Sequence, residues 1–186
     1  AGVEVRSPEN YYDGLFVLRG ALVSAGTADN PVSITSSSCC NSSLVAVPPD
    51  SAQSSSLRLS HTRIAGQNVR LLGNATPGTL AILDSRLDGV STGLDGSSGE
   101  VTFERNRIVG SFNQSFDIAN PAEGEVVVQD NRFRRMDVTC SGAGRLTMSG
   151  NTFERTSRAG SADDCVLDLR GNHWETPDSG IGGRII

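Results

Sequence analysis

Two copies of one eight-residue pattern, Val101-Thr-Phe-Glu-Arg-Asn-Arg-Ile108 and Val126-Val-Val-Gln-Asp-Asn-Arg-Phe133, set the architecture of this chain. Each copy has two apolar residues separated by one position, then polar residues, an asparagine and a last apolar residue two positions later. Apolar residues two apart point to the same face of a strand. The pattern therefore predicts a strand, a bend near the asparagine and a second strand whose last residue points inward again.

The same pattern recurs six times, and its last apolar residue returns every 20–25 positions. Two weaker copies, Leu15–Leu22 and Val32–Cys39, precede the six clear ones. A unit of about 22 residues cannot bury its own apolar face, so successive units must stack on one another. We therefore expect an all-β solenoid of about 7–8 coils. The last apolar residues of the six copies are Ile64, Leu87, Ile108, Phe133, Phe153 and Trp174.

Stacked strands lie about 4.8 Å apart, so equivalent residues of successive coils form columns. Asn106, Asn131, Asn151 and Asn172 share one position of the repeat, and we expect their amides to bond from coil to coil. Asparagine tolerates left-handed backbone geometry and bonds to nearby backbone groups. We therefore expect the bend of each coil at the asparagine itself.

The repeat resembles that of right-handed parallel β-helix proteins of the pectate-lyase-like class. The segment Gly20–Ser36 resembles an early coil of bacterial secreted members, in which a Gly-Thr-x-Asp-Asn-Pro turn joins two strands. The segment Asn172–Thr176 resembles their closing Asn-x-Trp-Gly-Thr, except that Glu175 replaces the glycine. The resemblance implies a right-handed parallel β-helix over residues 15–175, with a cap or lead-in at 1–14 and a tail or cap at 176–186. It specifies the fold and leaves the activity open, because one fold hosts many functions.

Composition excludes several classes of function. All 16 basic residues are arginine, so mechanisms that need a lysine base, a Schiff base or a P-loop lysine are ruled out. The net charge of −5 and the pI near 5.0 argue against nucleic acid as a partner. No run of 18 apolar residues is present, so we expect no membrane span.

The four cysteines point to an oxidising compartment. An even number of cysteines in a chain rich in serine and threonine is typical of a secreted or cell-surface protein. We favour a Cys140–Cys165 disulfide, with Cys39 and Cys40 either bonded to each other or reduced; four buried thiols are the competing interpretation. No CxxC or Cys/His cluster occurs, so the sequence offers no zinc site.

Four arginines occupy the position just before the last apolar residue of successive copies. This position alternates with two inward ones, so its side chains should face solvent. Arg63, Arg86, Arg107 and Arg132, called the arginine ladder below, would form a cationic stripe about 15 Å long. Such a stripe would suit the carboxylates of an acidic polysaccharide. The competing interpretation is a solvated ladder that is neutralised by nearby acids, namely Asp84, Asp88, Glu104 and Asp130.

These observations lead to two functional hypotheses. The first is a non-catalytic extracellular module for surface attachment, adhesion or assembly, with acidic polysaccharide or other subunits of a surface assembly as partners. The alternative is a polysaccharide-binding module or a Ca²⁺-dependent polyuronate lyase that uses the arginine ladder, because pectate lyases combine carboxylate-bound Ca²⁺ with an arginine base. In an enzyme, Arg107, Arg132 and Asp130 would be the first catalytic candidates. We expect no cofactor or metal outside the lyase alternative.

Overall fold

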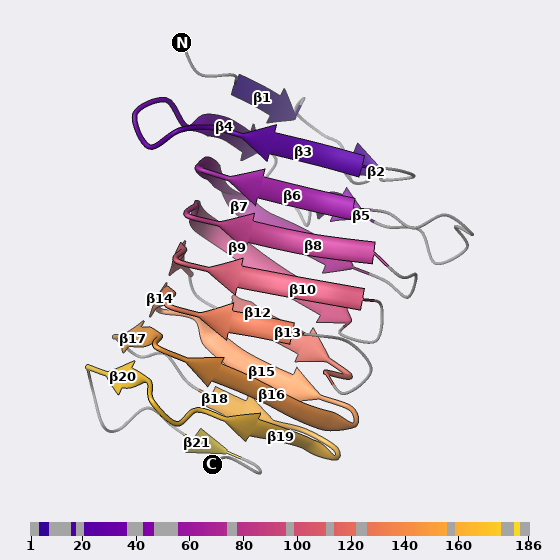
Figure 1. Cartoon of the computed structure of the whole chain (residues 1–186), viewed down its shortest axis with the longest axis vertical. Helices are drawn as coiled ribbons and strands as arrows, with labels where there is room; N and C mark the ends of the chain where they lie inside the picture. Colours follow the sequence, from indigo (N-terminus) through magenta and orange to yellow (C-terminus); the bar gives the residue numbers. More distant parts are fainter. Residues whose placement is uncertain are drawn as a thin grey trace.

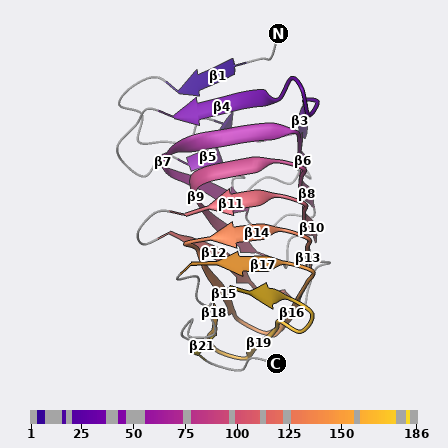
Figure 2. The same cartoon turned by 90° about the vertical axis from the view of Figure 1, so that its left-hand side faces the viewer.

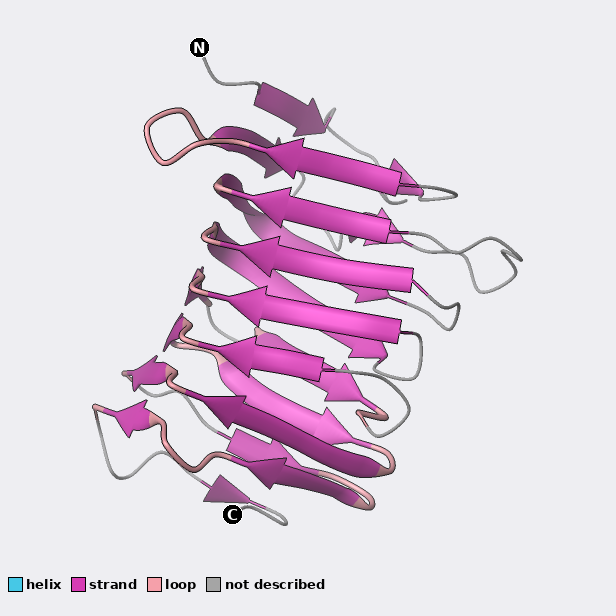
Figure 3. Cartoon of the chain, viewed as in Figure 1, coloured by secondary structure: helices cyan, strands magenta, loops and turns pink. Residues whose placement is uncertain are grey.

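The computed structural model describes most of the chain. The described ranges are 4–7, 16–17, 21–36, 43–46, 56–73, 78–95, 99–110, 114–121, 126–155, 159–175 and 181–182. Every regular element within these ranges is a β-strand, as Figure 3 shows by colour. The described residues contain no helix that could span a membrane.

One wall of the molecule is a seven-stranded parallel sheet, whose strands lie one below the other in Figure 1. Equivalent positions of the repeat pair in register, as in Leu57 with Leu80, Leu80 with Val101 and Val101 with Val126. The sheet consists of β3 (Ala21–Ala25), β6 (Ser56–Ser60), β8 (Gly78–Leu83), β10 (Gly99–Glu104), β13 (Val126–Gln129), β16 (Gly144–Ser149) and β19 (Cys165–Asp168).

A 14-stranded parallel sheet forms the other two walls, and the long strands β7 (Thr62–Gly73) and β9 (Arg86–Asp95) run through both of them. The second wall also contains β1 (Glu4–Ser7), β4 (Val32–Ser36), β11 (Arg107–Val109), β14 (Arg132–Arg134), β17 (Thr152–Glu154) and β20 (His173–Trp174). The third contains β2 (Phe16–Val17), β5 (Ser43–Ala46), β12 (Ser115–Ala119), β15 (Asp137–Ser141), β18 (Ala159–Ser161) and β21 (Ile181–Gly182). Figure 2 shows the second wall face on.

The chain is therefore a parallel β-solenoid, which confirms the all-β fold class predicted from the repeat. From residue 56 onward, the described ranges are separated only by short gaps. This continuous part of the solenoid contains fewer turns than the 7–8 coils expected from the repeat. Strands also form in both terminal segments, because β1 pairs with β4 and β21 pairs with β18.

The two weaker copies of the repeat do not occupy the wall that their apolar pattern predicts. Val32 and Ile34 pair with Thr62 and Ile64 on the second wall, so they are equivalent to the end of the repeat and not to its beginning. The beginning is Leu22, which pairs with Leu57. The error arose because the turn at 26–31, closed by bonds between Thr27 and Asn30, lengthens this coil between its two strands. Likewise, Phe16–Val17 pairs with β5 on the third wall.

The core is a column of apolar residues that runs the length of the solenoid. Its centre is a stack of five rings in which neighbouring ring centroids are 4.1–5.2 Å apart. Each such contact stabilises the fold by about 0.5–1.5 kcal/mol beyond the area that it buries. Trp174, expected in the core or at a cap, is partly buried and stacks on Phe153. The rings, in spatial order, are Phe103, Phe116, Phe133, Phe153 and Trp174.

The asparagine column bonds from coil to coil. The Oδ1 atom of Asn131 accepts from the backbone N–H of Asn106 at 2.9 Å and from its side-chain amide at 3.0 Å. Asn151 and Asn172 each accept the same two bonds from the coil before. Ser85 occupies the equivalent position one coil earlier, and its N–H donates to Asn106 Oδ1 at 2.9 Å. Each buried amide therefore satisfies the backbone N–H of the preceding turn.

The left-handed residue of each turn is the one before the asparagine, and the expected bend at the asparagine itself is wrong. The residues in this position have φ between 46° and 76°, whereas the four asparagines are not in the left-handed region. The asparagine keeps ordinary geometry because its side chain must point inward to reach the next coil. The left-handed column is His61, Asp84, Arg105, Asp130, Gly150 and Gly171.

Cys140 and Cys165 form a disulfide, which is the favoured pairing from the sequence. Cys140 lies in β15 and Cys165 begins β19, so the bond joins successive passes of the chain. Both residues are buried in the core. Cys39 and Cys40 lie outside the described residues.

Candidate ligand-binding face

The four arginines of the arginine ladder lie side by side on the second wall. Arg63 pairs with Arg86, Arg86 with Arg107 and Arg107 with Arg132, each on a neighbouring strand. All four are exposed. The column continues through Thr152 and His173. The four arginines face outward because the residues on either side of each one, such as Asn106 and Ile108 around Arg107, are buried.

Two acids form ion pairs with three of the four ladder arginines. Asp88 Oδ2 lies 2.6 Å from the Nε of Arg86 and 3.7 Å from the Nε of Arg63. Glu154, whose side chain is 7% exposed, contacts the 57% exposed side chain of Arg132. Within the described ranges, Arg107 makes no ion pair. The ladder is thus neutralised near its first two members and at Arg132, with a gap at Arg107.

A second outward-facing column lies two residues beyond the arginine ladder on each strand and also contributes to the charge of the wall. The residues at this position face outward again and pair in register, as Val109 does with Arg134 and Arg134 with Glu154. Asp88 stands at the equivalent place on β9. Within this second column, Asp88 and Glu154 therefore flank an apolar residue and a further arginine.

A dense group of arginines surrounds this position. Arg134 is partly buried, and within the described part of the chain its Nε atom is buried without a hydrogen-bond partner. Repulsion by Arg155, burial, and repulsion by Arg135, Arg107 and Arg132, in that order, lower the pKa of Arg134. Arg135 and Arg155 are exposed residues in left-handed turns. The arginine cluster, as it is called below, is Arg107, Arg132, Arg134, Arg135 and Arg155.

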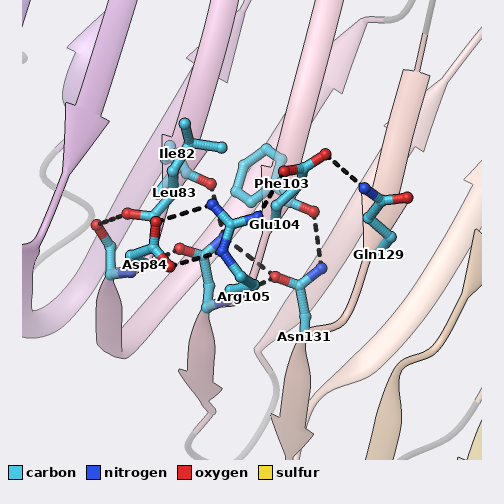
Figure 4. Close-up of polar contacts among 10 residues, drawn as sticks. Ile82, Leu83, Asp84, Phe103, Glu104, Arg105, Gln129 and Asn131 are labelled. Carbon is cyan, nitrogen blue, oxygen red and sulfur yellow. Dashed lines mark hydrogen bonds and ion pairs between the residues drawn. The ribbon is translucent and has the colours of Figure 1, made fainter.

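Three of the four acids expected to neutralise the ladder do not pair with it. Asp84 is held by Arg105, whose Nε and Nη2 donate to its two carboxylate oxygens at 2.7 and 2.9 Å. Glu104 accepts from Arg105 Nη1 at 2.9 Å and from Gln129, as Figure 4 shows. Asp130 makes no ion pair among the described residues. The reason is direction: these acids belong to the first strand and its turn, whereas the ladder belongs to the next strand.

The Asp84–Arg105 pair is a structural clamp between coils. The hydrogen bond from Arg105 holds the pKa of Asp84 below its usual range, and the two acids raise the pKa of Arg105. Asp84, Arg105 and Asp130 share one column, as expected from the sequence. Among the residues that the structure describes, no group of three or more His, Cys, Asp or Glu side chains is placed to hold a metal ion.

Sequence reasoning found the ladder and missed the arginine cluster. Arg134, Arg135 and Arg155 are absent from the candidates, as is Glu154, the partner of Arg132. The signal was available for Arg134 and Glu154, because residues two apart on a strand share a face. No such period places Arg135 and Arg155, which lie in turns.

Comparison of the chain with family models, curated proteins and solved structures finds no match.

Proposed function

We propose that this chain is a non-catalytic extracellular attachment module that binds an acidic polysaccharide along the second wall. The observation that carries the proposal is the arginine ladder, four exposed guanidinium groups in register on neighbouring strands, in which Arg107 has no acid beside it in the described structure. Like charges that are stacked directly repel. An anionic polymer lying along the wall would relieve this repulsion.

The geometry suits a linear polyanion. Neighbouring strands are about 4.8 Å apart, so one extended chain can meet several arginines without bending. A guanidinium binds a carboxylate with two parallel hydrogen bonds. Each contact at an exposed site is weak. Once one carboxylate of a polymer is bound, however, the next carboxylate is held at a high effective concentration near the next arginine, so the contacts reinforce one another. A rigid solenoid therefore suits attachment or adhesion to a charged polymer.

An extracellular location is supported by two features. The disulfide between Cys140 and Cys165 is a bond that persists in oxidising compartments. The repeat and its early coil also resemble those of bacterial secreted, pectate-lyase-like β-helix proteins. The proposal leaves out catalysis because two acids of the second wall, Asp88 and Glu154, are engaged with ladder arginines.

The proposal is tested by titrating polygalacturonate into the protein at low salt. The variant Arg63→Ala/Arg107→Ala leaves no acid without a partner, because Asp88 keeps Arg86. The matched control Arg58→Ala/Arg145→Ala removes two exposed arginines from the seven-stranded sheet and leaves Asp168 with Arg170.

We expect saturable binding that weakens as salt rises. The first variant should bind about tenfold more weakly, and the control should stay within about twofold of the unaltered protein. Absence of saturable binding at low salt, or equal losses in both variants, would overturn the proposal. Release of unsaturated uronate products in the presence of Ca²⁺ would replace it with the lyase function.

A further inference from the structure

The arginine cluster concentrates positive charge in a small part of the second wall. Its five members come from three neighbouring coils, with Arg107 on β11, Arg132 and Arg134 on β14, and Arg135 and Arg155 in the turns that follow β14 and β17. Strands about 4.8 Å apart and a step of about 6.6 Å between alternate residues place these side chains within reach of one small ligand.

The cluster is far from neutral. Glu154 contacts Arg132, and it is the one carboxylate in the described structure that forms an ion pair with a member. Five guanidinium groups thus face one acid, in a chain whose net charge is −5. Elsewhere on the same wall positive charge is better neutralised, since Asp88 forms ion pairs with both Arg63 and Arg86.

Arg134 carries a buried donor beside Glu154, its register partner on β17. Its Nε atom is buried and, within the described residues, bonds to nothing. A buried donor without a partner destabilises the fold. Such an atom in a native structure calls for an explanation, and a shift of the Arg134 side chain toward Glu154 or toward a bound anion would supply the missing acceptor. A bound anion would also offset the repulsion by four other arginines, which lowers the pKa of Arg134.

We propose that the arginine cluster binds a phosphate ester group carried by the acidic polysaccharide. A carboxylate offers one charge and two oxygens in one plane, whereas a phosphate monoester carries about 1.5 to 2 negative charges and three acceptor oxygens. The donors come from three coils and from both strands and turns, so an anion with three acceptor oxygens can meet more than one guanidinium group. This inference rests on the proposed function, because the acidic polysaccharide is the polymer that carries the phosphate ester.

The first test uses inorganic phosphate as the probe, with acetate at equal ionic strength as the comparison. Binding is followed by the NMR shifts of the arginine Nε–H groups. We expect saturable binding of phosphate, at least about tenfold weaker binding of acetate, and a loss of about tenfold or more in Arg134→Gln. The exposed Arg155→Gln should also bind more weakly, and it guards against a folding defect in the first variant. Arg58→Gln, on the other sheet, should bind as the unaltered protein does.

Arg134→Lys separates charge from geometry, because lysine keeps the charge and loses the planar fork. We expect Arg134→Lys to recover only part of the affinity lost in Arg134→Gln. Absence of saturable phosphate binding, or equal binding by Arg134→Gln, Arg155→Gln and the unaltered protein, would overturn the inference.

The second test separates this inference from the proposed function. We expect phosphomannan, a polysaccharide with phosphate esters, to bind more tightly than polygalacturonate, and unphosphorylated mannan not to bind. Binding of polygalacturonate without any phosphate response would refute the phosphate site and leave the attachment function standing. Binding of inorganic phosphate without any polysaccharide would refute the attachment function and assign the cluster to the free anion. Single-stranded DNA that binds as tightly as phosphomannan would overturn the assignment to a polysaccharide.

Discussion

The side chain of Asp130 lies directly over Gly150 on the next coil. A Cβ atom at Gly150 would fall within 3.0 Å of Asp130 Oδ1, a separation that real Cβ atoms essentially never show. Both residues are left-handed, with φ of 55° and 66°. The backbones are held together there, since the N–H of Asp130 donates to Ser149 O at 3.1 Å. The carboxylate of one coil's turn thus occupies the space that a side chain at Gly150 would need on the next coil.

Gly150→Ala should therefore destabilise the protein for two separate reasons. The left-handed backbone costs an alanine about 1–2 kcal/mol, and moving the exposed carboxylate of Asp130 aside adds up to about 0.5 kcal/mol. Gly171→Ala is the control, because Gly171 has φ of 76° but open space around its Cβ position. We expect Gly150→Ala to lower the free energy of unfolding more than Gly171→Ala does, as measured by urea denaturation.

The double variant Asp130→Ala/Gly150→Ala isolates the steric part. Truncating Asp130 removes the obstacle and leaves the backbone penalty, so the effect of Gly150→Ala should shrink toward that of Gly171→Ala. Equal effects of Gly150→Ala with and without Asp130 would show that the contact has no energetic consequence.

Asn131→Ala should be among the most damaging single changes. Asn131 accepts from the N–H of Asn106 and donates to Phe103 O at 2.8 Å, so its loss leaves two buried backbone groups unsatisfied. At about 1–3 kcal/mol for each group, we expect unfolding to be easier by about 3 kcal/mol. Urea denaturation measures the change, with the exposed Thr147→Ala as a control within about 0.5 kcal/mol. A small effect of Asn131→Ala would mean that water replaces the amide.

Reduction of the Cys140–Cys165 disulfide should lower the free energy of unfolding by about 3 kcal/mol. The bond closes a loop with a sequence separation of 25 residues, and loops of this size restrict the unfolded chain by about that amount. The measurement is urea denaturation with and without dithiothreitol. Cys140→Ala/Cys165→Ala serves as the control, because its stability should no longer respond to dithiothreitol through this bond.

The stability should fall in acid partly through Asp168. The hydrogen bond from Arg170, with Nη2 at 2.6 Å from Oδ2, is the largest cause of the lowered pKa of Asp168. A lowered folded-state pKa stabilises the protein above the unfolded pKa of about 3.9, and this contribution is lost as the pH falls through the lower folded-state value. Urea midpoints measured from about pH 6 downward should decline less steeply for Asp168→Asn than for the unaltered protein. Parallel declines would contradict the assignment.

The sequence predicted features that repeat with a fixed spacing. Asn106 and Asn131 could be placed in one inward column, and Arg107 and Arg132 in one outward column, because strand alternation and stacking alone determine both. It failed where a loop changes the spacing, as between Leu22 and Val32. There the apolar pattern survived, but its assignment to a wall needed the pairing of strands.

The candidate site divides along the same line. The sequence by itself determined the solenoid, its inward amides and the stacked arginines, because these follow from the period of the chain. Only the tertiary structure decided which charges meet: Asp84 with Arg105 instead of the ladder, Glu154 with Arg132, and four arginines around Arg134. The physical reason is that an ion pair depends on side-chain direction across neighbouring coils and around turns, and no period in the sequence encodes that direction.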